Sequence, residues 1–181
     1  YNGTKKRPIL LSAMRNGKKV VLVSDAGTPL ISDPGYKLVS ACYDDDIKIT
    51  SIPGPTAPIV ALTLSGLPSD RFAFQGFMPT RASAAKQALE ASASLDMTQI
   101  WFESARRLPQ TLPMMAQTYG NRLCVIAREL TKLHEEIERA PLSLLAEKYQ
   151  KAPPPRGEIV LLIEGASLSD KAVSDKEILL L

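Results

Sequence analysis

The stretch VVLVSDAGTPLISDPG, residues 20–35, carries the strongest structural signal in the chain. It opens with four apolar residues, three of them β-branched, which is typical of a strand buried on both faces. Gly27, Pro29, Pro34 and Gly35 then fix an unusual backbone path before a helical pattern begins. A loop between a strand and a helix lies at the carboxyl edge of a sheet, where open α/β sheets bind ligands. The stretch therefore predicts an α/β fold with a candidate ligand site at this loop.

The polar side chains of the loop have two possible roles. These side chains are Asp25, Thr28, Ser32 and Asp33. They can hydrogen-bond a ligand, or they can brace the loop itself, as Asp and Ser often do. The loop matches neither the phosphate-binding P-loop nor the G-x-G-x-x-G fingerprint. Its residue types alone leave both interpretations open.

Strands and helices are expected to alternate along the whole chain. Apolar runs predict strands at residues 20–23, 47–52, 71–74, 99–102, 123–126 and 159–163. Helical periodicity predicts helices at residues 8–16, 35–43, 56–65, 83–93, 108–119 and 142–149. The alternation indicates an α/β architecture, and the unbroken apolar runs are typical of a largely parallel sheet.

A turn-rich segment, GLPSD at residues 66–70, predicts a domain boundary. Residues 1–69 supply only two expected strands, too few to stand alone, so we interpret them as the end of a first α/β domain. Residues 70–166 are expected to form a second α/β domain, and the polar residues 167–181 a linker toward a further C-terminal segment. The chain begins at Tyr1 without an initiator Met, so we interpret it as a piece of a longer protein.

Composition excludes several classes of protein. The 181 residues are 45% hydrophobic with a net charge of +3, and no run approaches the roughly 20 apolar residues that span a bilayer. Cys42 and Cys124 each lie in an apolar stretch and are interpreted as buried thiols of a reducing compartment. With a single histidine, His134, the chain offers no ligand cluster for a metal, and we expect none. A G-x-S-x-G nucleophile elbow is also absent.

A second strand-to-helix loop, IPGPTA at residues 52–57, repeats the pattern of the first. Thr56 can cap the following helix, or it can present its hydroxyl and the helix N-terminus to a polar ligand. Because the two loops belong to successive strand–helix units, we expect them to lie side by side.

Several motifs occur in a characteristic order. They are SDAGTPLISDPG at 24–35, PGPTA at 53–57, SGLP at 65–68, GFMP at 76–79, and RELTK at 128–132 followed by HE at 134–135. Together they resemble the small-subunit ribosomal RNA methyltransferases of the tetrapyrrole methylase superfamily, over residues 2–165. The resemblance implies two α/β domains with S-adenosylmethionine in the cleft between them. It also implies 2′-O-methylation of a cytidine ribose in the decoding region of small-subunit rRNA, a homodimer and a cytoplasmic location.

The resemblance also assigns residues to the cofactor. In the first domain these are Asp25, Ala26, Gly27, Thr28, Pro29, Ile31, Thr56 and Ala57. In the second domain they are Phe102, Ala127 and Gly157. The family's opening strand and its Gly-rich loop have no counterpart here, so we expect the site of this chain to be incomplete and this piece alone to be inactive. The family's Glu-Ser-Pro-His-Arg segment reads ESARR at 103–107, which argues against a catalytic histidine there.

The identity of a catalytic residue stays open. A ribose hydroxyl is a weak nucleophile, and a carboxylate or an amine can remove its proton. The candidates for that role are Asp25, Glu103, Glu129 and Lys132. The candidates for contacts with RNA phosphates are Arg106, Arg107, Arg128 and Lys132. Alternatively, Arg128, Glu129 and Lys132 pair only with one another.

Two other functions remain as hypotheses. One keeps the fold and changes the substrate to a corrin or porphyrin precursor that is methylated on carbon. The other is a non-catalytic module that binds RNA or a nucleotide.

Overall fold

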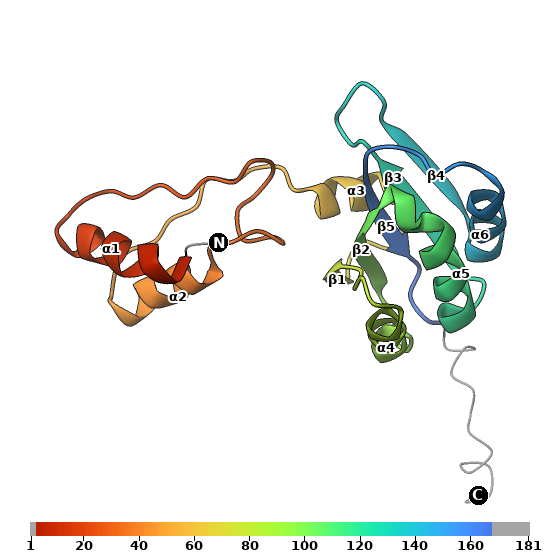
Figure 1. The fold of residues 1–181 in the computed structure, drawn as a ribbon, viewed down its shortest axis with the longest axis horizontal. Helices are drawn as coiled ribbons and strands as arrows, with labels where there is room; N and C mark the ends of the chain where they lie inside the picture. The colour runs from red at the N-terminus through yellow and green to blue at the C-terminus, as the bar shows by residue number, and fades with distance from the viewer. Residues whose placement is uncertain (1–2, 168–181) are drawn as a thin grey trace, which may run out of the picture. The chain divides into compact units, whose positions relative to one another are not determined.

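The computed structural model describes residues 3–167, and the chain divides into two compact units, Tyr1–Thr56 and Ala57–Leu181 (Figure 1). We call them the first and the second unit and describe each by itself. The linker expected at 167–181 lies, except for Ser167, outside the described residues. In the described part of the chain, no helix combines the length and the apolar character needed to cross a bilayer.

The first unit contains two helices, α1 (Gly3–Arg15) and α2 (Tyr36–Asp44). Arg15 at the end of α1 binds both carboxylate oxygens of Asp45, at 2.6 and 2.8 Å, and so ties the ends of the two helices together. Cys42 of α2 is buried, as predicted.

The strands predicted at residues 20–23 and 47–52 are wrong for this structure. Neither segment forms a strand, and Val21, Val23 and Ile52 are 81%, 78% and 89% exposed. A strand needs a neighbour for its backbone N–H and C=O groups, and no described segment of the first unit pairs with either run.

The second unit is built on one five-stranded sheet. Its strands are β1 (Phe72–Phe77), β2 (Thr98–Ser104), β3 (Leu123–Arg128), β4 (Glu136–Pro141) and β5 (Glu158–Ile163). The spatial order is β1-β2-β5-β3-β4. Only β1 and β2 run parallel, and the other three pairs are antiparallel. The α/β fold is confirmed, whereas the largely parallel sheet is wrong.

Helices cover both faces of this sheet. Helix α3 (Ala57–Ser65) packs on one face, against Val160 and Leu162 of β5. The other face carries the 3-10 turn η1 (Ala105–Arg107) and the helices α4 (Ala82–Ser92), α5 (Leu108–Tyr119) and α6 (Leu142–Lys151). Successive residues of β5 therefore enter two different apolar layers, which explains why its sequence is an unbroken apolar run.

The structure places α3 in the second unit because its apolar side chains meet the sheet. Ala61, Leu62 and Leu67 are buried against Ile100 and Val125. The two units therefore divide between Thr56 and Ala57. The domain boundary at residues 69 and 70 was predicted for the longer protein, and it stays a prediction.

Candidate functional site

The loop at residues 24–35 is held by its own polar groups. The Ser24 hydroxyl lies 3.2 Å from the carbonyl oxygen of Ala26 and 3.0 Å from that of Gly27 and donates to this pair. The Ser24 hydroxyl thus braces the turn. Asp25 is exposed, and its carboxylate accepts no hydrogen bond from the described residues. The loop therefore presents the Asp25 carboxylate beside the backbone of a glycine turn, and Asp33 is exposed further along it.

The far end of the loop depends on a glycine. Gly35 has a φ of 139°, and a Cβ atom there would lie 2.6 Å from Leu22 Cδ2 and 2.9 Å from Leu30 Cδ1. Leu30 and Ser32 themselves have left-handed φ values of 74° and 59°. Such conformations persist only where their surroundings impose them, and they are common at binding sites.

The two loops at residues 24–35 and 52–57 do lie side by side, although neither follows a strand in this structure. The Thr28 hydroxyl donates to the carbonyl oxygen of Pro55 at 3.1 Å, and a Cβ on Gly27 would lie 3.7 Å from the same oxygen. This confirms the expectation that residues 24–35 and 52–57 meet. It also shows that the Thr28 side chain braces the loops, so its hydroxyl oxygen retains only acceptor capacity toward a ligand. Ile31, three residues after Thr28, is 39% exposed.

Residues predicted for the cofactor in the second unit gather at one edge of the sheet. Phe102 of β2 and Ala127 of β3 both lie opposite Val160 of β5, so the three residues form one row on the α3 face. Gly157 immediately precedes β5 at the same edge. The strand register thus brings together Phe102, Ala127 and Gly157, which are far apart in sequence.

At this edge the Glu129 side chain packs directly against the backbone of Gly157. Gly157 has a φ of 109°, and a Cβ there would lie 2.5 to 2.7 Å from three side-chain atoms of Glu129. The Glu129 carboxylate accepts a hydrogen bond from the Glu158 backbone N–H at 2.9 Å. In return, the Glu129 N–H donates to the Glu158 carbonyl oxygen at 3.1 Å. Sequence reasoning missed the role of Glu158, although a glycine just before a strand is a recognisable signal of close backbone approach.

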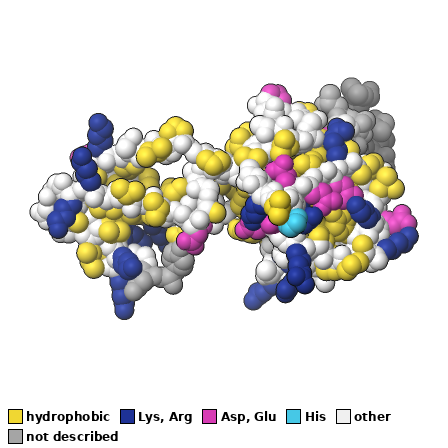
Figure 2. Space-filling view, turned by 90° about the horizontal axis from the view of Figure 1, so that it is seen from above, with side chains coloured by type: hydrophobic (Ala, Val, Ile, Leu, Met, Phe, Trp, Pro, Cys, Tyr) yellow, Lys and Arg dark blue, Asp and Glu magenta, His cyan; other side chains and the backbone are white. Residues whose placement is uncertain are grey.

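The basic candidates at this edge are paired with acids. Arg128 lies 2.7 Å from a Glu136 carboxylate oxygen, and Lys132 lies 3.0 Å from Glu129 and 2.7 Å from Glu158. Figure 2 looks onto this edge, where Lys, Arg, Asp and Glu side chains are interspersed around the chain's one histidine. Of the mutual pairing of Arg128, Glu129 and Lys132 that was the alternative to RNA contacts, the structure contains only the pair of Lys132 with Glu129. The idea that the three pair only with one another is wrong, because Arg128 pairs with Glu136 and Lys132 also pairs with Glu158.

These contacts favour the charged forms of both Glu129 and Lys132. The Glu158 backbone N–H, and then the Lys132 ammonium, lower the pKa of Glu129 below its ordinary value. The carboxylates of Glu158 and Glu129 raise the pKa of Lys132. A carboxylate with a lowered pKa is a weaker base, and a lysine with a raised pKa stays protonated. Neither environment favours removal of a proton from a substrate.

Glu103 and Arg107 serve the interior of the second unit. Glu103 is 5% exposed and accepts hydrogen bonds from the Thr111 hydroxyl of α5 and from the Ser104 N–H. Arg107 lies 3.2 Å from Glu103 and donates to the carbonyl oxygens of Met78 and Pro79. Glu103 therefore faces α5, on the opposite side of the sheet from Phe102. Arg106 is exposed and pairs with no described acid.

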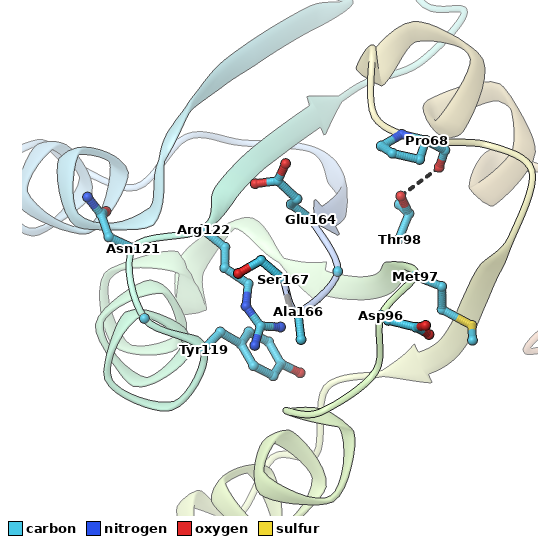
Figure 3. A pocket seen from close by; sticks show the side chains of 12 residues that line it. Pro68, Asp96, Met97, Thr98, Tyr119, Asn121, Arg122, Glu164, Ala166 and Ser167 are labelled. Carbon is cyan, nitrogen blue, oxygen red and sulfur yellow. Dashed lines mark hydrogen bonds between the residues drawn. The ribbon is translucent and has the colours of Figure 1, made fainter. Parts of the chain in front are cut away.

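A pocket of about 560 Å³ lies at the opposite edge of the same sheet (Figure 3). Its wall includes Thr98 at the start of β2, Arg122 before β3 and Glu164 after β5. Its polar groups are largely engaged within the protein: Thr98 donates to the Pro68 carbonyl oxygen and Arg122 to that of Ala93. None of the predicted site residues lines it. We therefore place the candidate site at the edge with Phe102, Ala127 and Gly157.

Curated relatives are similar in sequence to this chain over nearly all of its length. It is 44% identical to the Ribosomal RNA small subunit methyltransferase I of Mesorhizobium japonicum, over 100% of this chain and 62% of that protein. It is 43% identical to the protein of the same name from Escherichia coli O157:H7, over 91% of this chain and 58% of the relative. The chain thus spans about three fifths of the length of these relatives.

Solved structures share the fold at lower identity. The methyltransferase CobJ is 20% identical with a TM-score of 0.64, over 90% of this chain and 71% of that one. Diphthine synthase is 15% identical with a TM-score of 0.67, over 92% of this chain and 68% of that one. The model of the family described as Tetrapyrrole (Corrin/Porphyrin) Methylases matches residues 4–146. This match confirms the resemblance seen in the motifs: the chain belongs to the tetrapyrrole (corrin/porphyrin) methylases.

Proposed function

We propose that the full-length protein transfers a methyl group from S-adenosylmethionine to the 2′-hydroxyl of a cytidine in the decoding region of small-subunit rRNA. The observation that carries this proposal is the 44% identity, over the entire chain, to a relative named Ribosomal RNA small subunit methyltransferase I. Family membership supports methyl transfer as the reaction class. The proposal includes rRNA or the assembled small subunit as partner, a homodimer and a cytoplasmic location.

The residues assigned to the cofactor fit its chemistry in each unit separately. S-adenosylmethionine combines a cationic sulfonium, an ammonium, ribose hydroxyls and a flat adenine. In the first unit, the exposed Asp25 carboxylate, which has no partner in the described part of the chain, suits a cation or a hydroxyl, and the Gly27 backbone is open to close approach. In the second unit, Phe102 offers an aromatic ring, and the strand register brings it into one row with Ala127, with Gly157 at the same edge of the sheet.

Bound S-adenosylmethionine would supply an electrophilic methyl group on a positively charged sulfur. The protein's task is then to hold the ribose hydroxyl in line with the methyl–sulfur bond and to accept its proton. Of the four candidates for that proton, Glu103 is buried and fully engaged, Glu129 is a weakened base, and Lys132 stays protonated. Asp25 is the candidate whose carboxylate has no partner among the described residues, and we assign it the role of proton acceptor.

The experiment compares three acceptors with the full-length protein and labelled S-adenosylmethionine. Naked small-subunit rRNA, assembled small subunits and a tetrapyrrole precursor are incubated side by side, and the methylated nucleotide is identified by mass spectrometry. We expect label in a ribose 2′-O-methyl group of the RNA. Label only in the tetrapyrrole would contradict the proposal in favour of carbon methylation. Calorimetry that detects no binding of S-adenosylmethionine would favour a non-catalytic binding module.

A further inference from the structure

A β-bulge in β1 changes the face on which Phe77 lies. The pairing runs from Phe74 opposite Ile100 directly to Gly76 opposite Trp101, so Gln75 is an extra residue. Gly76 adopts a φ of 76°, which favours glycine. Without the bulge, Phe77 would lie opposite Glu103, on the face covered by α5; with it, Phe77 lies opposite Phe102. Bulges are frequent beside functional sites, where they redirect a side chain.

The redirected ring joins a row of aromatic side chains. The ring centroids of Phe77 and Phe102 are 5.1 Å apart, and those of Phe74 and Phe102 are 5.0 Å apart. Phe77 is nevertheless 65% exposed. The bulge therefore does not bury Phe77: it presents a large flat ring to solvent next to a residue assigned to the cofactor.

The backbone immediately after Phe77 is held by hydrogen bonds at Met78 and Pro79. The Met78 N–H donates to the Phe102 carbonyl oxygen at 2.9 Å, and the Met78 side chain is 3% exposed. Arg107 holds the carbonyl oxygens of Met78 and Pro79 at 3.0 and 2.6 Å. An exposed ring on a fixed backbone loses little conformational entropy when it binds a partner.

The position of the ring indicates what it binds. Across the sheet the order is Phe77, Phe102, Val160 and Ala127, so Phe77 extends the proposed cofactor row toward the outer strand β1. Arg106, which is exposed and pairs with no acid among the residues that the structure describes, follows β2 at the same edge of the sheet. An exposed aromatic ring is the kind of group on which an unpaired nucleobase stacks, and basic side chains along the same edge of a site can follow the phosphate backbone.

We propose that Phe77 stacks on a nucleobase of the RNA substrate, beside the methyl-transfer site. This inference rests on the proposed function and adds to it a residue that selects an unpaired, flat acceptor. Phe102 serves the cofactor side of the row, and Phe77 serves the substrate side.

The experiment uses the full-length protein and a single-stranded transcript of the small-subunit rRNA decoding region. Binding of the transcript and of S-adenosylmethionine is measured for the parent, Phe77→Ala and Phe72→Ala. Phe72 is the matched control: it lies on the same strand at the other edge and is 39% exposed. We expect Phe77→Ala to weaken RNA binding roughly 5- to 100-fold, the range seen when a stacking ring is removed, with unchanged affinity for S-adenosylmethionine. Phe72→Ala should match the parent.

Two further variants separate stacking from apolar packing. Phe77→Trp should retain RNA binding because it keeps a flat ring, and Phe77→Leu should lose it. Equal binding by Phe77→Leu and the parent would overturn the proposal, as would a loss of S-adenosylmethionine affinity in Phe77→Ala or a change in its oligomeric mass. A parent that methylates RNA while Phe77→Ala binds it normally overturns this inference alone. A parent that binds no RNA overturns the proposed function and the inference together.

Discussion

Gly157 allows the Glu129 side chain to lie directly against the backbone at the charged edge of the second unit. Gly157 has a φ of 109°. A Cβ atom at this position would lie within 2.7 Å of three side-chain atoms of Glu129. We expect Gly157→Ala to lower the free energy of unfolding by about 1–3 kcal/mol, because it adds a steric clash to backbone strain. Gly120→Ala is the control, since Gly120 has a φ of 74° with open space around it. Urea denaturation should show the larger loss for Gly157→Ala; equal losses would mean that the contact with Glu129 costs nothing.

Glu129 should make stability depend on acid pH. Its pKa in the folded state is lowered from 4.5 by the Glu158 N–H and by Lys132. The stabilisation is therefore fully present above the unfolded-state pKa and is lost as the pH falls through the lower folded-state value. Glu129→Gln should flatten the decline of the thermal midpoint below about pH 4.5. Glu90→Gln, on α4, removes the same charge and should leave that decline unchanged.

Asp25 should matter for turnover because its exposed carboxylate has no hydrogen-bond partner among the described residues and so stays available to the substrate. Removing a general base typically costs 10²- to 10⁴-fold in rate, so we expect Asp25→Asn in the full-length protein to lower kcat by roughly that factor. Asp33→Asn is the matched control, because Asp33 is exposed on the same loop. Steady-state kinetics with rRNA measures the effect. A kcat for Asp25→Asn equal to that for Asp33→Asn would remove Asp25 from the mechanism.

For single residues, the sequence indicates which side chains can do chemistry. It does not indicate which of these side chains already form hydrogen bonds or ion pairs within the protein. Thr28, Glu103 and Lys132 were all plausible ligand or proton contacts. Their partners are Pro55, Thr111 and Glu158, which are 27, 8 and 26 residues away. Such contacts depend on strand register and helix packing, which local residue patterns do not encode.

Strands follow from sequence when both of their faces are buried. β5 sends successive residues into two apolar layers, and its run of apolar residues was correctly predicted as a strand. β4 reads EIERAP, lies at the edge of the sheet and was missed because its charged residues face solvent or form ion pairs. The prediction for residues 20–23 is wrong in the opposite way. Their apolar pattern predicts a strand, yet the described residues supply no partner strand. A hydrophobic pattern indicates that a segment prefers to be buried. It does not indicate that a partner strand is present to pair with it.

Helix α3 should stabilise the second unit through its buried face. Leu62 is 5% exposed against the sheet, whereas Leu64 on the same helix is 46% exposed. Leu62→Ala should therefore lower the free energy of unfolding of the second unit by about 2–4 kcal/mol, the usual cost of a cavity in a core. Leu64→Ala should change it by no more than about 0.5 kcal/mol. Equal effects, measured by urea denaturation of the chain, would argue that α3 belongs with the first unit, as the predicted boundary at residue 70 implies.

The charge of the whole molecule is concentrated in its first unit. Residues 1–56 hold eight Lys and Arg against five Asp and Glu, while residues 57–181 hold fourteen of each. Lys5, Lys6, Lys18 and Lys19 lie on or just after α1, in a segment that contains no acidic residue. In the second unit, by contrast, the basic candidates Arg107, Arg128 and Lys132 are paired with acids. Contacts with RNA phosphates should therefore rely more on α1 than on those three residues.

This distribution predicts how RNA binding depends on salt. Each phosphate contact with single-stranded RNA contributes about 0.7 to the slope of log affinity against log salt concentration. Changing Lys5, Lys6, Lys18 and Lys19 to Gln in the full-length protein should weaken RNA binding and reduce that slope by up to about 3, while binding of S-adenosylmethionine stays unchanged. The control changes Lys86, Lys148, Lys151 and Arg71 to Gln; these four are paired with acids, and the net charge falls by the same amount. If both sets flatten the slope equally, net charge alone steers RNA binding; if only the first does, α1 contacts the phosphates.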